Sequence, residues 1–600
     1  MCGIVGYIGS RPAAPILLEA LRRLEYRGYD SAGMVTVFKK LFVKKDRGKI
    51  ADIDQRLKLT EMPGQLGLGH TRWATHGEPS RVNAHPHLDN SGKIAVVHNG
   101  IIENYSEIKK FLQRNGYRFV SKTDTEVIPN LISYFVGRGY GLEESVRRAA
   151  KRLKGSFALA IVSVDEPDRI IAVRQDSPLI IGLGSGEVFL ASDIPAMLQH
   201  TNRVVVLENG EMAVLTPDRV VIKKFSSGFE VRRKPMLVKW TAEMAEKGGY
   251  PHFTLKEIFQ QPDAVQETLR APSDELKKLA RFLLSAKRVY FVACGTSFHA
   301  ALVAKYALAK LAEFPVEVMI SSEFGEVGRI DDETAVLAIT QSGETADTLK
   351  AVEAARAAGA KVACLTNVVG SSITRMSDLV CYTYAGPEVS VVATKTFAAQ
   401  VAYLLRLAIH LAEVRRRSRL SCRLLAAGLK VLPEQMRRVL TETNSQVKQL
   451  ANRLAKAENI YLIGRGIGYP LVLEGALKIK EITYIHSEGM PAGELKHGTL
   501  ALIEEETPVI AVVPPGEMRV KMVSNVEEVK ARGASVIAIA DNGQDLREHV
   551  DELISIPRTE EFFSPLLFII PLQLLAYYIT VERGQDPDRP RSLAKSVTVE

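Results

Sequence analysis

Apolar positions from residue 1 to about 235 fall into many short runs, with few long helical patterns between them. The runs 203–207 and 211–215 are separated by a stretch that contains Asn209 and Gly210, a dipeptide favoured in tight β-hairpin turns. We therefore expect a hairpin here, within a layered α+β domain. From 239 to 249 the chain becomes polar and contains Gly248 and Gly249, which predicts a hinge linker between domains.

The second half has a different pattern, in which apolar β-runs alternate with long, alanine-rich helical stretches. This alternation predicts parallel α/β architecture. The runs 288–293, 335–340 and 361–366 recur in the same layout about 170 residues later, at 459–463, 508–513 and 535–540. We infer two copies of one doubly wound domain. The expected domains are 2–238, 250–430 and 431–585, with the linker at 239–249.

Composition supports a multidomain globular protein. A chain of 600 residues exceeds what one hydrophobic core normally holds and predicts three or four folding units. Hydrophobic residues make up 46% and charged residues 24%, which excludes disordered and fibrous classes. The five cysteines are scattered without a CxxC pair, which argues against a disulfide framework or a thiolate zinc site. We expect a reducing compartment, the cytoplasm.

The net charge of the chain indicates which classes of binding partner to expect. The formal net charge of +9 is small for 78 basic and 69 acidic residues, so we expect no nucleic-acid partner, whereas an anionic small substrate suits this balance.

The N-terminus has no basic region leading into an apolar signal segment, so we do not expect secretion. The apolar stretch 562–581 is long enough to cross a bilayer, but prolines interrupt it. We interpret it as a buried core helix and expect no membrane partner.

Hydroxyl-rich loops follow two expected strands of the first α/β copy, at 294–297 and 340–345, and each loop opens a helix. Backbone N–H groups and hydroxyls at such places can hold a phosphate. The second copy has Pro514 and Pro515 at the equivalent of the second loop, and proline cannot donate a hydrogen bond. One phosphate site, in the first copy, is therefore expected; ordinary N-caps and turns remain the alternative.

The front domain contains groups suited to attack on an amide. If Met1 is removed, Cys2 carries both a thiol and an α-amine with a pKa of about 8, which can serve as the base of the thiol. Arg72 can bind a carboxylate, and Asp124 can hold an ammonium group. His98, Asn99 and Gly100 follow the expected strand 93–97, where the Asn99 amide and the Gly100 N–H can form an oxyanion hole. The histidines at 70, 76, 85, 87 and 98 show no metal-ligand spacing, so we expect no metal.

These motifs carry a family resemblance. Residues 1 to about 240 resemble the glutaminase domain of class II amidotransferases, which has the αββα fold of N-terminal-nucleophile hydrolases, through CGIVGYIG, LEYRGYDSAG, HTRWATHGEPS, VVHNGIIEN and TDTEV. The second half resembles tandem sugar isomerase domains. The whole chain is similar to the glutamine–fructose-6-phosphate aminotransferase family, in its bacterial type, because no long insertion separates the halves.

The resemblance implies roles for residues of the front domain. Cys2 would be the nucleophile, and Asn99 and Gly100 would stabilise the oxyanion. Trp73 would gate an internal passage for ammonia. The implied glutamine-binding groups are Arg27, Arg72, Thr75, His76 and Asp124.

The resemblance also implies roles in the second half. Glu481 would move a proton between C1 and C2 of the sugar, with Lys478 as a supporting cation. His497 would open the sugar ring from a neighbouring subunit, which implies a homodimer. In the C-terminal tail, 586–600, Ala594 would contact the sugar and Lys595 would form a Schiff base with it, which requires an unprotonated amine. The implied phosphate-binding groups are Ser297, Thr340, Gln341, Ser342 and Thr345.

The implied reaction transfers the amide nitrogen of glutamine to fructose 6-phosphate with ketose–aldose isomerisation, without a cofactor. Its products are glucosamine 6-phosphate and glutamate, in the first step of UDP-N-acetylglucosamine synthesis. Thr340 and Ser592 depart from the serine and asparagine associated with those places. A related sugar-phosphate deaminase or deglycase and a non-catalytic sugar-phosphate sensor remain alternatives. A nicotinamide-binding oxidoreductase fits less well, because Tyr469 stands where the third glycine of its fingerprint belongs.

Overall fold

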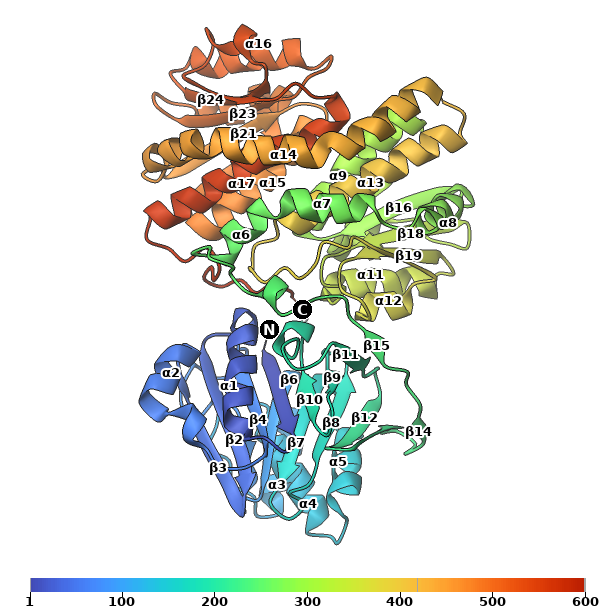
Figure 1. The fold of residues 1–600 in the computed structure, drawn as a ribbon, viewed down its shortest axis with the longest axis vertical. Coiled ribbons are helices and arrows are strands. Elements are labelled where there is room, and N and C mark those ends of the chain that lie inside the picture. The colour runs from blue at the N-terminus through green and yellow to red at the C-terminus, as the bar shows by residue number, and fades with distance from the viewer. Residues whose placement is uncertain (1, 418, 598–600) are drawn as a thin grey trace. The chain divides into compact units, whose positions relative to one another are not determined.

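The computed structural model describes residues 2–417 and 419–597 (Figure 1). The chain divides into two compact units. The first unit extends to Glu246 and also includes the chain from Ala594 onwards, and the second is Lys247–Leu593. The break between Glu246 and Lys247 falls within the expected linker, and the other expected domain boundaries stay predictions.

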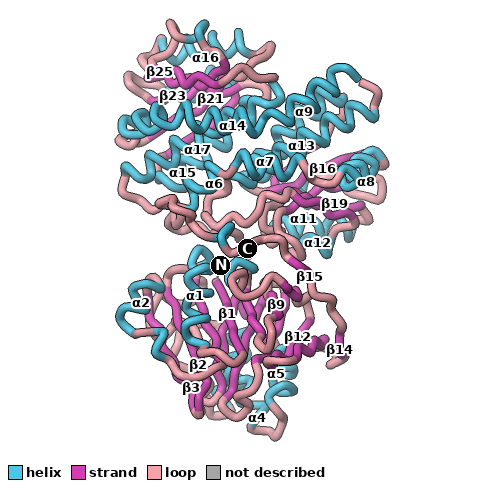
Figure 2. The backbone as a smooth tube through the Cα atoms, in the orientation of Figure 1, coloured by secondary structure: helices cyan, strands magenta, loops and turns pink. Residues whose placement is uncertain are grey.

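Antiparallel sheets form the first unit, with helices on their outer faces (Figures 1 and 2). One sheet has the order β15 (Met236–Leu237), β11 (Arg203–Val206), β9 (Ile180–Leu183), β10 (Val188–Ala191), β1 (Gly3–Ile8), β4 (Leu66–Arg72), β2 (Ser31–Phe38) and β3 (Lys40–Arg47). The other has the order β14 (Glu230–Val231), β13 (Arg219–Lys224), β12 (Glu211–Thr216), β8 (Ile170–Gln175), β7 (Gly155–Ser163), β6 (Ile94–Ile102) and β5 (His87–Leu88). The helices are α1 (Ala13–Leu24), α2 (Ile50–Leu57), α3 (Tyr105–Arg114), α4 (Val127–Val136) and α5 (Leu142–Ala150).

Alternation along the strands explains this layering. In β1, Ile4 and Ile8 belong to a core that also contains Ala158 and Ala160 of β7, so they face the other sheet. The opposite face of β1 lies against α1. Helices α3, α4 and α5 cover the outer face of the second sheet with a separate apolar cluster. Every residue of β1 is buried because both of its faces are covered.

The expected hairpin is wrong. Strands β11 and β12 flank Asn209 and Gly210 but lie in different sheets: β11 pairs with β9 and β15, and β12 pairs with β8 and β13. The turn residues contact a third segment, since the Asn209 side chain accepts a hydrogen bond from Asp176 N at 2.9 Å. The dipeptide does form a tight turn, with φ of +77° at Gly210, but the turn carries the chain from one sheet to the other.

Parallel sheets form the second unit, as the sequence pattern predicts. The first has the order β17 (Glu317–Ile320), β16 (Arg288–Ala293), β18 (Thr334–Ile339), β19 (Lys361–Thr366) and β20 (Leu379–Tyr382). The second has the same order of crossovers: β22 (His486–Pro491), β21 (Asn459–Gly464), β23 (Pro508–Val513), β24 (Ser535–Asp541) and β25 (Glu552–Ile556). The matching order confirms two copies of one doubly wound domain.

Helices of the second unit pack on these sheets and join them. They are α6 (Phe253–Phe259), α7 (Gln261–Leu269), α8 (Ser273–Leu284), α9 (Gly295–Ala312), α10 (Phe324–Val327), α11 (Ala346–Ala357), α12 (Ser372–Met376), α13 (Lys395–Val414), α14 (Arg419–Leu454), α15 (Gly468–Thr483), α16 (Arg519–Lys530) and α17 (Ser564–Glu582). One apolar core runs from Phe291 of β16 through α9, α15 and α17 to Ile510 of β23. The expected boundary at 430 lies inside α14.

Two helical stretches, Lys395–Val414 and Glu561–Glu582, have the length and hydropathy of membrane spans. The most apolar windows of these stretches are 78% and 89% buried inside the protein. Helix α17 packs against α14 and α15, and Pro571 lies within it. Stretch 562–581 is thus the buried core helix that the interrupted apolar pattern predicts.

Candidate active sites

Cys2 directly precedes β1, and β1 pairs with β4 so that Gly3 lies opposite Thr71. This register brings Cys2 beside the start of the loop after β4. Trp73 N donates a hydrogen bond to Cys2 Sγ at 3.3 Å, and Sγ lies 3.5 Å from Trp73 O. Burial raises the pKa of the Cys2 thiol, although the Trp73 N–H and the Arg72 guanidinium oppose this effect. Met1, whose removal the prediction needs, lies outside the described residues.

The carbonyl oxygen of Cys2 is held by side chains from two other segments. Arg27 Nε donates to it at 3.2 Å, and Asn99 Nδ2 donates to it at 2.9 Å. Arg27 is itself held by Asp193, whose Oδ2 lies 3.1 Å from Arg27 Nη1. Asn99 Nδ2 also donates to Ser192 Oγ at 2.8 Å. The structure therefore brings together Cys2, Arg27 and Asn99, which the sequence separates by up to 97 residues.

The strand expected at 93–97 is longer in the structure: β6 continues to Ile102, so Asn99 and Gly100 lie within it. Gly100 has φ of +117°, a conformation that disfavours every residue except glycine. A Cβ at this position would lie 1.9 Å from Ser156 O on the neighbouring strand β7. The backbone irregularity that a glycine permits thus falls inside the strand, where the sequence pattern alone predicts a strand end.

Three of the expected glutamine-binding groups, Arg72, Thr75 and His76, lie at the end of β4 and in the loop that follows it. Arg72 is 3% exposed, and its Nη2 donates to the carbonyl oxygens of His76 and Gly77, the second at 2.9 Å. Its Nη1 is buried and has no hydrogen-bond partner among the described residues. Asp124 is buried, and its Oδ2 accepts a hydrogen bond from Ile102 N at 2.8 Å. Thr75 is exposed.

Trp73 is half-buried and packs edge-on against Tyr29, with 5.5 Å between ring centroids. Gly28 lies so close to this segment that a Cβ would come within 2.7 Å of Trp73 N. The glycine of the motif LEYRGYDSAG therefore permits the close approach of two backbone segments. The gating role of Trp73 stays a prediction.

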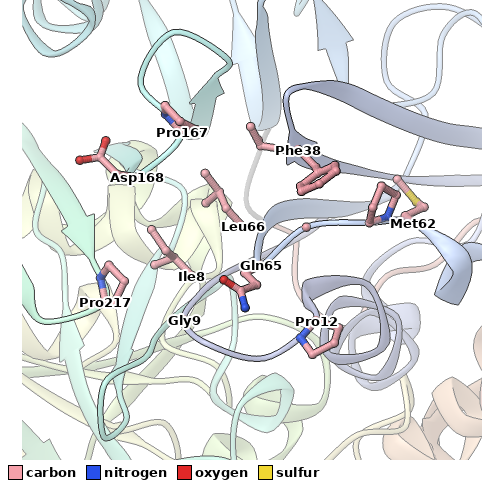
Figure 3. Close-up of a pocket in the computed structure, with 13 residues that line it drawn as sticks. Ile8, Gly9, Pro12, Phe38, Met62, Gln65, Leu66, Pro167, Asp168 and Pro217 are labelled. Carbon is pink, nitrogen blue, oxygen red and sulfur yellow. The ribbon is translucent and has the colours of Figure 1, made fainter.

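A cavity of about 630 Å³ lies elsewhere in the first unit (Figure 3). Its lining includes Ile8, Phe38 and Met62, with Gln65 and Asp168 as polar members. Ile8 is the last residue of β1, so the cavity lies at the end of the strand opposite to Cys2. None of the residues expected in either site lines it.

The hydroxyl-rich loops of the second unit follow neighbouring strands β16 and β18, so they meet at the carboxyl edge of one sheet. Ser297, in the first turn of α9, accepts a hydrogen bond from Gln400 Nε2 at 3.0 Å. Thr340 Oγ1 accepts one from Gly343 N at 3.2 Å and lies 3.4 Å from Thr345 Oγ1. Gln341 and Ser342 are half-buried in the same loop. Ser297 at the start of α9 and the other four expected phosphate-binding residues, which follow β18, thus lie at one edge of the sheet.

Helix α15 presents a buried row of charges at positions i, i+4 and i+7. Lys478, 2% exposed, lies between Glu474 Oε1 at 3.3 Å and Glu481 Oε1. Lys478 Nζ also donates to Thr296 Oγ1 at 3.1 Å. Burial alone would lower the pKa of Lys478, but the two carboxylates raise it above its ordinary value. Lys478 is therefore held as a cation.

Sequence reasoning missed Glu474 and His299, and it placed Thr296 in the hydroxyl-rich loop 294–297 without predicting its contact with this cluster. Glu474 is fully buried, and it accepts from Thr296 Oγ1 at 3.1 Å while its Oε2 lies 2.7 Å from His299 Nδ1. The signal that could have found Glu474 is its spacing from Lys478 and Glu481, which places all three on one helix face. No sequence signal indicates that Thr296 and His299 contact α15, because they come from the other copy of the repeat.

The remaining expected residues lie in the last part of the chain. His497 ends a short 3₁₀ turn, Ala492–His497, and its side chain is exposed. Before the tail reaches Ala594, Asp588 anchors it by accepting from Phe253 N and Thr254 N at 2.8 and 2.7 Å. Ser592 has φ of +58°, a conformation that asparagine tolerates better than serine. Ala594 and Lys595 group with the first unit.

Four buried histidines of the first unit form a cluster. His70, His85, His87 and His98 lie close together, with 4.1 Å between the ring centroids of His70 and His85. Among the described residues, no group of three or more His, Cys, Asp or Glu side chains is arranged to hold a metal ion. The expectation of a reaction without metal stays a prediction.

Comparison with known proteins assigns both units. Residues 70–199 match the family model of the glutamine amidotransferase domain, and residues 282–410 and 453–583 match that of the SIS domain. The chain is 50% identical to the glutamine–fructose-6-phosphate aminotransferases [isomerizing] of Thermococcus kodakarensis and Methanothermobacter thermautotrophicus, over 100% of each chain. The C-terminal domain of glucosamine-fructose-6-phosphate aminotransferase from Francisella tularensis is a structural neighbour, with 36% identity and a TM-score of 0.54. The superposition covers 57% of this chain and 99% of the Francisella tularensis chain.

Proposed function

Because the chain belongs to the family of glutamine–fructose-6-phosphate aminotransferases, we propose that it moves the amide nitrogen of glutamine to fructose 6-phosphate and isomerises the ketose. The products are glucosamine 6-phosphate and glutamate. The observation that carries this proposal is the convergence of Arg27 and Asn99 on Cys2, in a unit joined to two sugar isomerase domains.

Glutamine hydrolysis is assigned to the first unit. The buried, unpartnered Nη1 of Arg72 supplies a donor for the substrate carboxylate, and Asp124 supplies a counter-charge for its ammonium group. Cys2 Sγ forms a bond to the amide carbon, and the Gly100 N–H and the Asn99 amide stabilise the resulting oxyanion. The hydrogen that Asn99 Nδ2 donates to the Cys2 carbonyl must then be shared with the oxyanion. Ammonia leaves, and water hydrolyses the thioester to glutamate.

Activation of the thiol needs a base. The raised pKa of Cys2 keeps the thiol protonated near neutral pH, so a proton must leave as the sulfur attacks. The α-amine of Cys2, exposed by removal of Met1, is the proposed acceptor of that proton. It then returns the proton to the departing nitrogen.

Sugar chemistry is assigned to the second unit, with the phosphate on the loops around Ser297 and Thr340. Ammonia replaces the C2 oxygen of the open ketose, which leaves as water, and Glu481 takes a proton from C1 and returns it to C2. Lys478 is held as a cation, so it keeps Glu481 ionised and cannot itself form a Schiff base. This favours Lys595 as the amine that condenses with the ketone.

The active assembly is proposed to be a cytoplasmic homodimer. The exposed side chain of His497 is accessible to a second copy, in which it would open the sugar ring. All five cysteines are free thiols, as a reducing compartment requires. Mixing H497A with E481Q subunits tests whether one subunit supplies His497 to the sugar site of the other. Heterodimers of the two inactive variants are expected to recover activity. If the two variants never complement each other, the proposal is contradicted.

The proposed reaction is tested with glutamine labelled with ¹⁵N at its amide. The label is expected in glucosamine 6-phosphate made by the wild type. The C2A variant should lose glutamine-dependent synthesis but retain isomerisation of fructose 6-phosphate, because Glu481 and the phosphate-binding loops lie in the other unit. The matched variant E481Q should retain glutamine hydrolysis and lose isomerisation. An unlabelled hexosamine product, or unchanged glutamine use by C2A, refutes the proposal.

A further inference from the structure

His70 lies in β4 and is fully buried. Its Nε2 is 2.9 Å from the backbone oxygen of His98 and 3.0 Å from Asn99 Oδ1. A backbone carbonyl oxygen only accepts hydrogen bonds, so Nε2 carries the hydrogen. The tautomer of His70 is thereby determined by a backbone atom, whichever way the Asn99 amide is oriented.

The His70 ring is also neutral. Its Nδ1 is buried without a hydrogen-bond partner among the described residues, and its ring stacks on His85 at 4.1 Å between centroids. A second proton on Nδ1 would create a buried, uncompensated charge beside another histidine. Burial accordingly lowers the pKa of His70 to about 3. His70 therefore donates from Nε2 at any pH near neutrality.

This donor determines the orientation of the Asn99 amide. Asn99 Oδ1 accepts from His70, so Nδ2 points the other way, to Cys2 O at 2.9 Å and Ser192 Oγ at 2.8 Å. The reversed amide would place its N–H groups against the His70 N–H and its oxygen against the Cys2 carbonyl. Both reversed contacts are repulsive.

The hydrogen bond joins the two sheets of the first unit. His70 is in β4, the strand that pairs with β1 and so lies beside Cys2, whereas Asn99 is in β6 of the other sheet. We propose that His70 is a positioning residue, whose Nε2–H holds Asn99 Oδ1 and thereby aims the Asn99 NH₂ group at Cys2, where the oxyanion forms. This inference rests on the proposed hydrolysis of glutamine by Cys2.

A pair of variants isolates the donor. In H70Q the side-chain amide nitrogen reaches about as far as the His70 Nε2 and still donates, whereas H70M has similar length and cannot. We expect H70M to lower kcat for glutamine hydrolysis about 100-fold, the effect of losing an oxyanion donor, with KM within about threefold of wild type. H70Q should stay within about tenfold of wild-type kcat.

His87 supplies the matched control, since it is buried in the same cluster and its Nε2 contacts Thr123, not Asn99. H87M should leave kcat within about threefold of wild type. Equal loss in H70M and H87M, or equal loss in H70M and H70Q, would overturn the positioning role. So would a rise in KM without a fall in kcat.

Glutamate γ-semialdehyde gives a binding test, because its aldehyde adds to a thiol and forms a tetrahedral adduct that needs the oxyanion donors. Its affinity should fall in H70M about as much as kcat, while the affinity of glutamate stays unchanged. Equal affinity of wild type and H70M for the aldehyde would overturn the inference.

Two further measurements keep the outcome interpretable. If H70M does not fold, ¹⁵N-histidine NMR of the wild-type chain determines the tautomer of His70, and H70Q is used to assign its signal. The inference requires a neutral Nε2–H tautomer from pH 7 to 5. An Nδ1–H tautomer or a charged ring overturns it. If C2A hydrolyses glutamine as well as wild type does, the proposed function fails. Wild-type behaviour of H70M together with a dead C2A refutes only the role of His70.

Discussion

Lys478 offers the sharpest test of how the charges on α15 are held together. K478M removes the ammonium group and retains an apolar stem of similar length. Glu474, which is fully buried, and Glu481, whose side chain is 15% exposed, would then face each other without the cation between them. Thr296 and His299 would still contact Glu474, so part of its hydrogen bonding would survive.

The size of the effect follows from the geometry. Two unit charges at the 3.3 Å between Lys478 Nζ and Glu474 Oε1 attract by about 5 kcal/mol at an effective dielectric constant of 20. Desolvation of the buried groups offsets much of this attraction, and removing one partner of a buried pair costs about 3–5 kcal/mol. The second unit has about 350 residues, and its unfolding entropy is about 2.1 cal/mol/K per residue. We therefore expect the unfolding midpoint of this unit to fall by about 4–7 °C.

Calorimetry of the full chain measures this shift, together with an assay of fructose 6-phosphate isomerisation. The double variant K478M/E474Q removes the orphaned carboxylate and should recover at least half of the lost stability, but not the isomerase activity. K480M, at an exposed position on the same helix, is the matched control and should change the midpoint by less than about 1 °C. A K478M midpoint within 1 °C of wild type, or a double variant less stable than K478M, would refute the buried-charge argument.

Three further perturbations follow from the described contacts. G100A should lower the unfolding free energy of the first unit by about 3 kcal/mol and abolish glutamine hydrolysis, because its Cβ would lie 1.9 Å from Ser156 O. The control G92A, whose Cβ would have nothing within 4 Å, should lower the unfolding free energy by about 1 kcal/mol. Equal effects of the two variants in denaturant titrations would contradict this prediction. The unfolding free energy of the first unit should fall by about 2 kcal/mol between pH 7 and 5 through His70, because its pKa of about 3 in the folded protein means that only the unfolded chain takes up the proton. A calorimetric midpoint equal at pH 7 and 5 would oppose this. D588A removes the hydrogen-bond acceptor at the start of α6, so it should lower the unfolding free energy of the second unit by about 1–2 kcal/mol. It should also speed amide hydrogen exchange at 586–593. Unchanged exchange would show that other contacts hold the tail.

Much of the fold could be predicted because it depends on local patterns. Strands β16, β19 and β23 coincide with apolar runs, since a strand buried on both faces needs an unbroken apolar segment. The repeat was visible for the same reason. Cys2, Arg72 and Asn99 were candidates from their chemistry and their motifs alone, whereas Arg27 was named only through the family resemblance.

The errors arose where a local signal has two tertiary outcomes. Asn209 and Gly210 form the expected tight turn, but whether the flanking strands pair depends on which sheet each one joins. Gly100 permits an unusual φ both at a strand end and within a strand. Only the position of β7 beside β6 decides between these cases.

The sequence by itself therefore determined the types of chemical group available, the positions of three strands in each copy of the repeat and the amphipathic or fully apolar character of those segments. Only the tertiary structure decided which charges are paired and which tautomer a ring adopts. Glu474 meets His299 across 175 residues, and His70 meets the carbonyl oxygen of His98 across the space between two sheets. The physical reason is that burial and hydrogen-bond partners are properties of surroundings, which segments remote in the chain supply.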